Sequence, residues 1–68
     1  MAKSQAEFLA DLEEKRPTMV DGIIRNLIHA GVLLTHEAER YRGVLEPYTL
    51  AQIVQVMIVS QELVEAVA

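Results

Sequence analysis

The stretch Thr49–Ala68, TLAQIVQVMIVSQELVEAVA, decides the fold of this chain. It carries no charge before Glu62, and it is rich in β-branched residues, which are common in strands. Yet it contains neither glycine nor proline, and Thr49 and Gln52 at its start have the spacing of a capping box, which begins helices. The stretch therefore predicts one apolar helix over residues 50–66.

This stretch is not expected to span a membrane. The uncharged run from Pro47 to Gln61 is shorter than the roughly 18 residues of a spanning helix, and it contains Gln52 and Gln55. The net charge of −4 argues against an anionic membrane surface. The start, MAKSQAEF, lacks the apolar segment of a signal peptide, and the chain has no cysteine, as is common in a reducing cytoplasm. We expect a cytoplasmic protein.

The length of the chain makes self-association an early hypothesis. Its 68 residues allow one domain, close to the size at which a single core is barely sufficient. Domains of this size are commonly stabilised by disulfides, metals or oligomerisation. Because cysteine is absent, disulfides and thiolate metal sites are excluded, which leaves oligomerisation.

Two helices are predicted in the first half of the chain. Ser4 and Glu7 have the capping-box spacing, and Pro17 is expected to end the helix that they begin. Thr18 is expected to cap a second helix, which Gly31 ends as the C′ residue. The apolar face of this second helix follows the helical period and consists of Met19, Val20, Ile23, Ile24, Leu27 and Ile28.

A third helix lies between Thr35, its expected cap, and Pro47, which stops it. Its predicted inner face is Ala38, Tyr41, Val44 and Leu45. The whole chain is then an all-α bundle, in which three main helices follow a short N-terminal one and consecutive helices pack in roughly antiparallel order. The predicted helices cover residues 5–16, 19–30, 36–45 and 50–66 of a single domain, 1–68.

The last helix is too apolar for its neighbours to cover completely. Its apolar residues form two seams, one of Leu50, Val54, Met57 and Val64 and the other of Ile53, Val56, Leu63 and Val67. A helix that is apolar nearly all round is usually buried nearly all round. We therefore predict that dimerisation through this helix completes the bundle. The expected interface residues are Ile53, Val56, Met57, Leu63 and Val67. In the alternative, a compact monomer, the first helix covers the second seam.

Catalytic and metal chemistry find little support in the sequence. His29 and His36 are separated by a turn, so they do not have the i, i+4 spacing of a helical metal pair. The pair Glu13 and Glu14 points in two directions on a helix. The three glycines stand alone, so no phosphate-binding loop is present. We expect a protein that is not an enzyme and has no cofactor and no metal site.

A dimeric helix-turn-helix-like DNA-binding protein is the alternative function. The segment from Ile23 to Leu45 has two helices around Gly31. However, Glu37 and Arg40 stand where that motif needs apolar residues, and the acidic balance of the chain disfavours nucleic acid as a partner. A weaker alternative is an acidic inhibitor that blocks a basic site on a larger protein.

The tetrapeptide Ser60-Gln61-Glu62-Leu63 resembles the signature of a small two-helix family of sporulation aspartyl-phosphate phosphatases. In that family the next position is an aspartate needed for activity. Val64 stands there in this chain, so no residue role is transferred.

The function that best fits these observations is a non-catalytic, intracellular protein–protein interaction or regulatory module. Its expected partners are a second copy of the chain and another protein. The predicted partner-binding surface consists of Glu37, Glu39, Arg40 and Arg42 on the third helix. The acidic first helix, with Glu7, Asp11 and Glu14, is the alternative surface.

Overall fold

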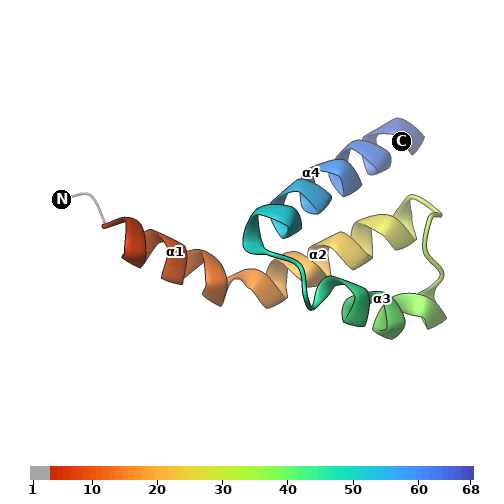
Figure 1. Ribbon diagram of the computed structural model, residues 1–68. Coiled ribbons are helices and arrows are strands. Elements are labelled where there is room, and N and C mark those ends of the chain that lie inside the picture. Colours follow the sequence, from red (N-terminus) through yellow and green to blue (C-terminus); the bar gives the residue numbers. More distant parts are fainter. Residues whose placement is uncertain (1–3) are drawn as a thin grey trace.

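The computed structural model describes residues 4–68, and within this range it is all-α, as predicted, without strands. Figure 1 shows α2 between α3 and α4, with α1 projecting from one end of the bundle. The helices are α1 (Gln5–Glu14), α2 (Arg16–His29), α3 (Ala38–Leu45) and α4 (Leu50–Val67), and a 3₁₀ turn, η1 (Thr35–Glu37), precedes α3.

The core forms around the apolar face of α2. Ile23 of α2, Leu45 of α3 and Ile53 of α4 have no exposed surface, so each of the three helices contributes one residue to the centre. The rest of the core comes from the face of α2 that the helical period predicts. The buried apolar residues are Val20, Ile23, Ile24, Leu27, Leu45 and Ile53.

The helices are not all antiparallel to their neighbours. α3 runs antiparallel to α2, because Arg16 at the start of α2 bonds the carbonyl of Glu46 after α3, whereas Asp21 further along binds Arg42. α4 has its largest contact with α2 and runs parallel to it, since Arg16 bonds the carbonyl of Tyr48 before α4 and Asn26 bonds Ser60. The antiparallel order expected of consecutive helices therefore holds in direction for α2 and α3 and for α3 and α4, but not for α1 and α2.

Gly31 ends α2 as predicted. It has a φ of 78°, which a residue with a side chain adopts at a cost. The N–H of Gly31 donates to the carbonyl of Ile28 at 3.0 Å, and the N–H of Val32 donates to that of Leu27 at 2.9 Å. These two bonds are the pair that defines a Schellman motif.

The boundary between α1 and α2 was predicted incorrectly. Pro17 does not end α1 but lies in the first turn of α2, where the missing N–H of proline costs nothing. Lys15 joins the two helices with a helical backbone, and Thr18 lies inside α2 without a capping role. Consequently α1 and α2 run almost end to end (Figure 1), and the radius of gyration is 13.4 Å, against about 11 Å for a compact domain of this length.

The start of the third helix also differs from the prediction. Thr35 does not cap it. Leu34 occupies the cap position of the 3₁₀ turn η1, and the Leu34 N–H donates to the Glu37 carboxylate at 3.0 Å. The chain then makes one 3₁₀ turn before α3 begins at Ala38. Of the predicted inner face, Leu45 is buried and Ala38 and Tyr41 pack against the core, but Val44 is exposed.

The start of α4 confirms its capping box. The Gln52 N–H donates to Thr49 Oγ1 at 3.2 Å, and the Thr49 N–H donates to Gln52 Oε1 at 2.8 Å. By length and composition alone α4 could also cross a membrane, with a mean hydropathy of 1.4 over its 18 residues. One of its sides nevertheless packs on α2, through the buried Ile53 and Ser60.

Candidate interaction surface

The side of α4 that was predicted to face a second copy packs largely on its own protomer. Ile53 is completely buried in the core, so it has no surface to offer a partner, and this part of the predicted interface was wrong. Val56, Met57 and Leu63 are partly buried and pack against the same core. Val67 is 58% exposed. The error arises because the apolar face of α2 packs on this seam, whose first residue, Ile53, is enclosed in the core.

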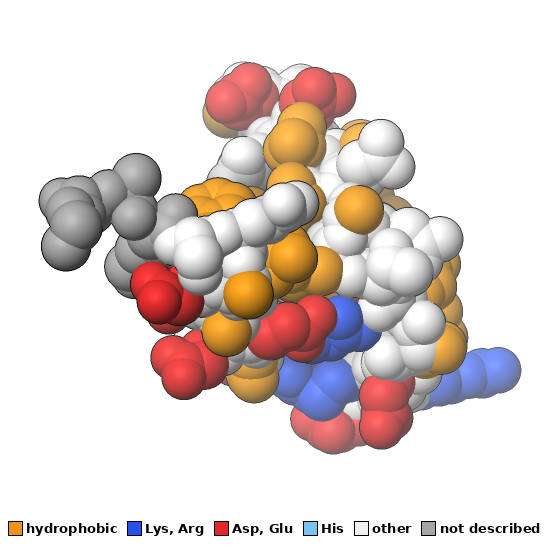
Figure 2. All heavy atoms as spheres, turned by 60° about the vertical axis from the view of Figure 1, so that its left-hand side comes forward, with side chains coloured by type: hydrophobic (Ala, Val, Ile, Leu, Met, Phe, Trp, Pro, Cys, Tyr) orange, Lys and Arg blue, Asp and Glu red, His pale blue; other side chains and the backbone are white. Residues whose placement is uncertain are grey.

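The outward side of α4 remains apolar and uncovered. Ile58 and Val59 are 47% and 53% exposed, although both lie in the charge-free part of the helix. Figure 2 shows hydrophobic side chains across the middle of one face of the molecule, with acidic side chains above and to the left of them.

A groove separates α3 from the outward side of α4. It has a volume of about 660 Å³ and opens to solvent. Tyr41 of α3 lines one wall, and none of the lining residues carries a charge. They are Leu27, Tyr41, Gln55, Val56, Ile58, Val59 and Ser60.

The Tyr41 hydroxyl is the ionisable group of this groove. Partial burial, and secondly the neighbouring Tyr48, raise its pKa above the ordinary value of 10.0. Because the folded protein holds this proton more tightly than the unfolded chain, the contribution to stability is complete below pH 10.0 and is lost as the pH rises through the raised pKa.

We therefore expect the free energy of unfolding to fall more steeply in the wild type than in the Tyr41→Phe variant above about pH 10. Urea denaturation of both proteins at about pH 9 and about pH 11 measures the difference. Equal losses of stability in the two proteins would show that Tyr41 ionises as freely in the folded state as in the unfolded chain.

The groove ends at a buried polar contact between α2 and α4. Asn26 Nδ2 donates to Ser60 Oγ at 3.1 Å, and Ser60 Oγ donates to the Met57 carbonyl at 2.7 Å. Ser60 has no exposed surface. Neither Asn26 nor Ser60 was predicted to have a structural role. The missed signal was the position of both residues: Asn26 lies at the edge of the apolar face of α2, and Ser60 lies between Val56 and Leu63 of an apolar seam, so the two polar residues can pair.

The four residues of the predicted partner-binding surface do not form one surface. Arg42 Nη1 lies 2.5 Å from Asp21 Oδ1 of α2, and its Nε lies 3.6 Å from Glu39 Oε1. The hydrogen bond to Asp21, with help from Glu39, raises the pKa of Arg42 above its ordinary value. Glu37 is engaged with the Leu34 N–H, and Arg40 lies on a different side of α3 from Arg42.

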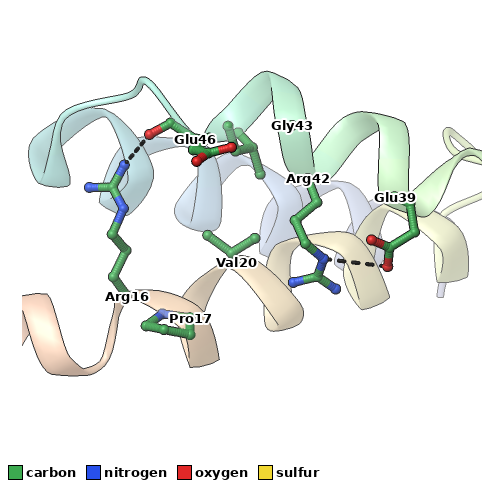
Figure 3. A pocket seen from close by; sticks show the side chains of 8 residues that line it. Arg16, Pro17, Val20, Glu39, Arg42, Gly43 and Glu46 are labelled. Carbon is green, nitrogen blue, oxygen red and sulfur yellow. Dashed lines mark hydrogen bonds and ion pairs between the residues drawn. The ribbon is translucent and has the colours of Figure 1, made fainter.

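Glu39 and Arg42 instead border a second, open cavity between α2 and α3 (Figure 3). Its volume is about 410 Å³, and it is lined by Arg16, Pro17, Val20, Glu39, Arg42, Gly43, Leu45 and Glu46. The two arginines at its edge are already engaged with protein partners, since Arg16 bonds a backbone carbonyl and Arg42 pairs with Asp21 and Glu39.

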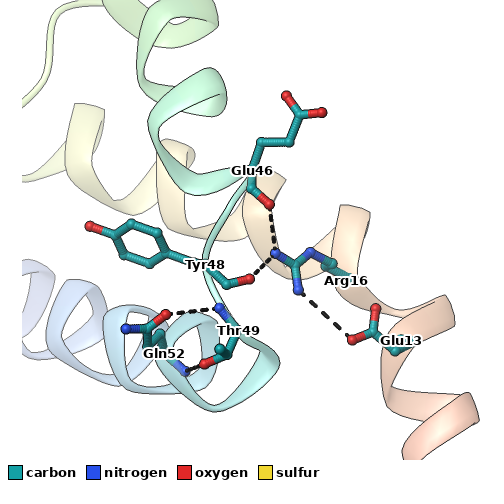
Figure 4. A network of polar contacts seen from close by, with 6 residues as sticks. All are labelled: Glu13, Arg16, Glu46, Tyr48, Thr49 and Gln52. Atoms are coloured by element: carbon teal, nitrogen blue, oxygen red, sulfur yellow. Dashed lines mark hydrogen bonds and ion pairs between the residues drawn. The ribbon is translucent and has the colours of Figure 1, made fainter.

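Arg16 is a structural residue that sequence reasoning assigned to the wrong helix end. Its guanidinium donates to the carbonyl of Glu46 at 3.1 Å and to that of Tyr48, and it lies 3.8 Å from Glu13 Oε1 of α1 (Figure 4). It therefore joins α1, the start of α2 and the segment between α3 and α4. This role was hidden because Pro17 was read as the end of a helix.

α1 is the alternative surface, and most of it is exposed. None of its residues is buried, and Phe8 and Leu9 are 55% and 48% exposed. Glu7 and Glu14 are exposed, and Asp11 is partly buried and already has an interaction partner. The Glu7 N–H donates to Ser4 Oγ at 3.2 Å, which confirms the predicted cap of this helix.

Metal-binding groups do not gather in the described part of the chain: residues 4–68 contain no cluster of three or more histidine, aspartate or glutamate side chains that could hold an ion. His29 and His36 are both exposed. Comparisons of the chain with protein-family models, with curated proteins and with solved structures found no match.

Proposed function

We propose that the protein is a small, non-catalytic intracellular interaction or regulatory module that forms a homodimer through the outward side of α4. The observation that carries this proposal is the incomplete cover of an apolar helix. Only Ile53 and Ser60 of α4 are fully buried, while Ile58 and Val59 remain about half exposed. A helix that is apolar on nearly every side is normally covered on nearly every side.

The total exposed surface supports the same proposal. The chain exposes 5111 Å², whereas a compact monomer of 7.6 kDa is expected to expose about 4300 Å². The difference is close to the roughly 800 Å² that each partner buries in a standard protein–protein interface. A second protein is then expected to bind the polar surfaces that the dimer leaves free, with Arg40 and the acidic side of α1 as candidates.

The two alternative functions have less support. The connection from Ala30 to Glu37 between α2 and α3 is longer than the three or four residues of a helix-turn-helix, and Arg42 is already paired with Asp21. The inhibitor interpretation depends on the small size and acidic balance of the chain alone, which a solvated surface explains equally well.

Light scattering behind a sizing column tests the proposal. We expect a mass near twice 7.6 kDa at tens of micromolar and dissociation on dilution. Ile58→Glu should shift the protein to the monomer, because Ile58 is exposed in the protomer and its replacement puts a charge in the interface. Arg25→Gln, which changes the net charge equally on the outer side of α2, is the matched control and should remain dimeric. A wild-type monomer at these concentrations would refute the proposal.

A further inference from the structure

The groove between α3 and α4 and the apolar stripe of α1 are two complementary surfaces on the same chain. The stripe consists of Phe8, Leu9 and Leu12, which share one side of α1. We propose that α1 of a second copy occupies this groove, and that two copies exchange these helices reciprocally. This inference rests on the proposed self-association and names the segment that covers α4.

The chemistry of the two surfaces matches. An amphipathic helix that lays its apolar stripe into an apolar groove is a common mode of protein recognition. Phe8 is the only phenylalanine of the chain and is 55% exposed, so it can serve as the anchor that such contacts usually need. Leu27, Val56 and Val59 supply apolar lining to receive it.

The charges of the two surfaces are also compatible. α1 carries Glu7, Glu13 and Glu14 around its stripe, whereas no acidic residue lines the groove. An acidic helix therefore meets a groove whose lining carries no acidic side chain to repel it.

The α1 helix is held away from the groove of its own chain. Phe8 lies seven residues before Lys15, and Leu27 lies twelve residues after it. At 1.5 Å per residue these separations are about 10 Å and about 18 Å, so α1 folded back on α2 would leave Phe8 short of Leu27, at the far end of the groove. The helical backbone at Lys15 and the contact between Arg16 and Glu13 also hold α1 in its outward direction.

Complementation between two variants tests the exchange. Phe8→Glu damages the helix that docks, and Val59→Glu damages the groove; both residues are more than half exposed in the protomer, so the fold should persist. We expect each variant alone to weaken dimerisation by at least about thirtyfold, the usual effect of losing an anchor residue. An equimolar mixture should recover a heterodimer, because one intact α1 then meets one intact groove.

Matched controls place the same new charge elsewhere on the same helices. Ala10→Glu lies on the side of α1 opposite the stripe, and Gln61→Glu lies on the side of α4 opposite Val59, so both should remain dimeric. Light scattering gives the masses, and circular dichroism verifies the helix content. If either glutamate variant loses helicity, Phe8→Ser and Val59→Ser replace the pair.

The outcomes separate this inference from the function on which it rests. A wild type that is monomeric would refute both. A dimeric wild type whose Phe8→Glu variant also stays dimeric would overturn the exchange and leave self-association standing. Two monomeric variants that fail to complement each other would also overturn it, because a symmetric contact between two α4 helices is not restored by mixing.

Discussion

Replacing Ile53 by alanine is expected to lower the free energy of unfolding by about 2–5 kcal/mol, the usual cost of truncating a buried isoleucine. Ile53 has no exposed surface and meets Ile23 and Leu45 at the centre of the bundle. A domain of this length is stable by only about 3–10 kcal/mol in total. The substitution should therefore remove a large part of the stability or unfold the chain, as measured by urea denaturation.

Ile58→Ala is the matched control for this prediction. It removes the same atoms from the same helix, but Ile58 is 47% exposed, so we expect a loss of less than about 1 kcal/mol in the protomer. The two variants should be compared at concentrations low enough to keep the protein monomeric. Equal effects at such concentrations would mean that Ile53 is not a core residue.

The Arg16→Ala variant is expected to have the second-largest effect, a loss of about 2–3 kcal/mol. Arg16 donates to the carbonyls of Glu46 and Tyr48, and hydrogen bonds from a charged donor contribute more than neutral ones. Its removal leaves these two carbonyls without their protein donor and releases the segment between α3 and α4. Arg16→Lys should restore only part of the loss, since an ammonium cannot reproduce the planar geometry of the guanidinium.

Thermal denaturation followed by circular dichroism measures this effect, with Arg25→Ala as the control. Arg25 is exposed on α2, so its truncation should change the stability by no more than about 0.5 kcal/mol. If the two arginine variants melt at the same temperature, the contacts of Arg16 do not contribute to the fold.

Local chemistry predicted the parts of the fold that short-range contacts determine. The caps at Ser4 and Thr49 and the glycine end of α2 at Gly31 depend on residues three to six positions apart, and all three were correct. The assignment of IVQVMIV to a helix followed from the same reasoning. These features could be predicted because the groups that pair are close in the sequence.

The errors concern features that depend on residues distant in the sequence, or on a residue that is compatible with two different positions in a helix. Proline is accepted both after a helix and in its first turn, so Pro17 alone could not locate the boundary between α1 and α2. Periodicity showed that α4 has two apolar seams but not which of them packs on α2, and Ile53 was therefore placed in the wrong contact. Asn26 and Ser60 are far apart in the sequence, and only the parallel packing of α2 and α4 brings them together.

The nearly continuous helix of α1 and α2 has a consequence for the motion of the chain. Its two parts are joined in line at Lys15, but they differ in the tertiary contacts that protect their backbone amide groups from opening. No residue of α1 is buried, so helical order should fray from its N-terminal end in rapid local opening. The opening should stop at Arg16, which is fixed to the segment before α4, so that amide protons exchange freely on one side of this residue and slowly on the other.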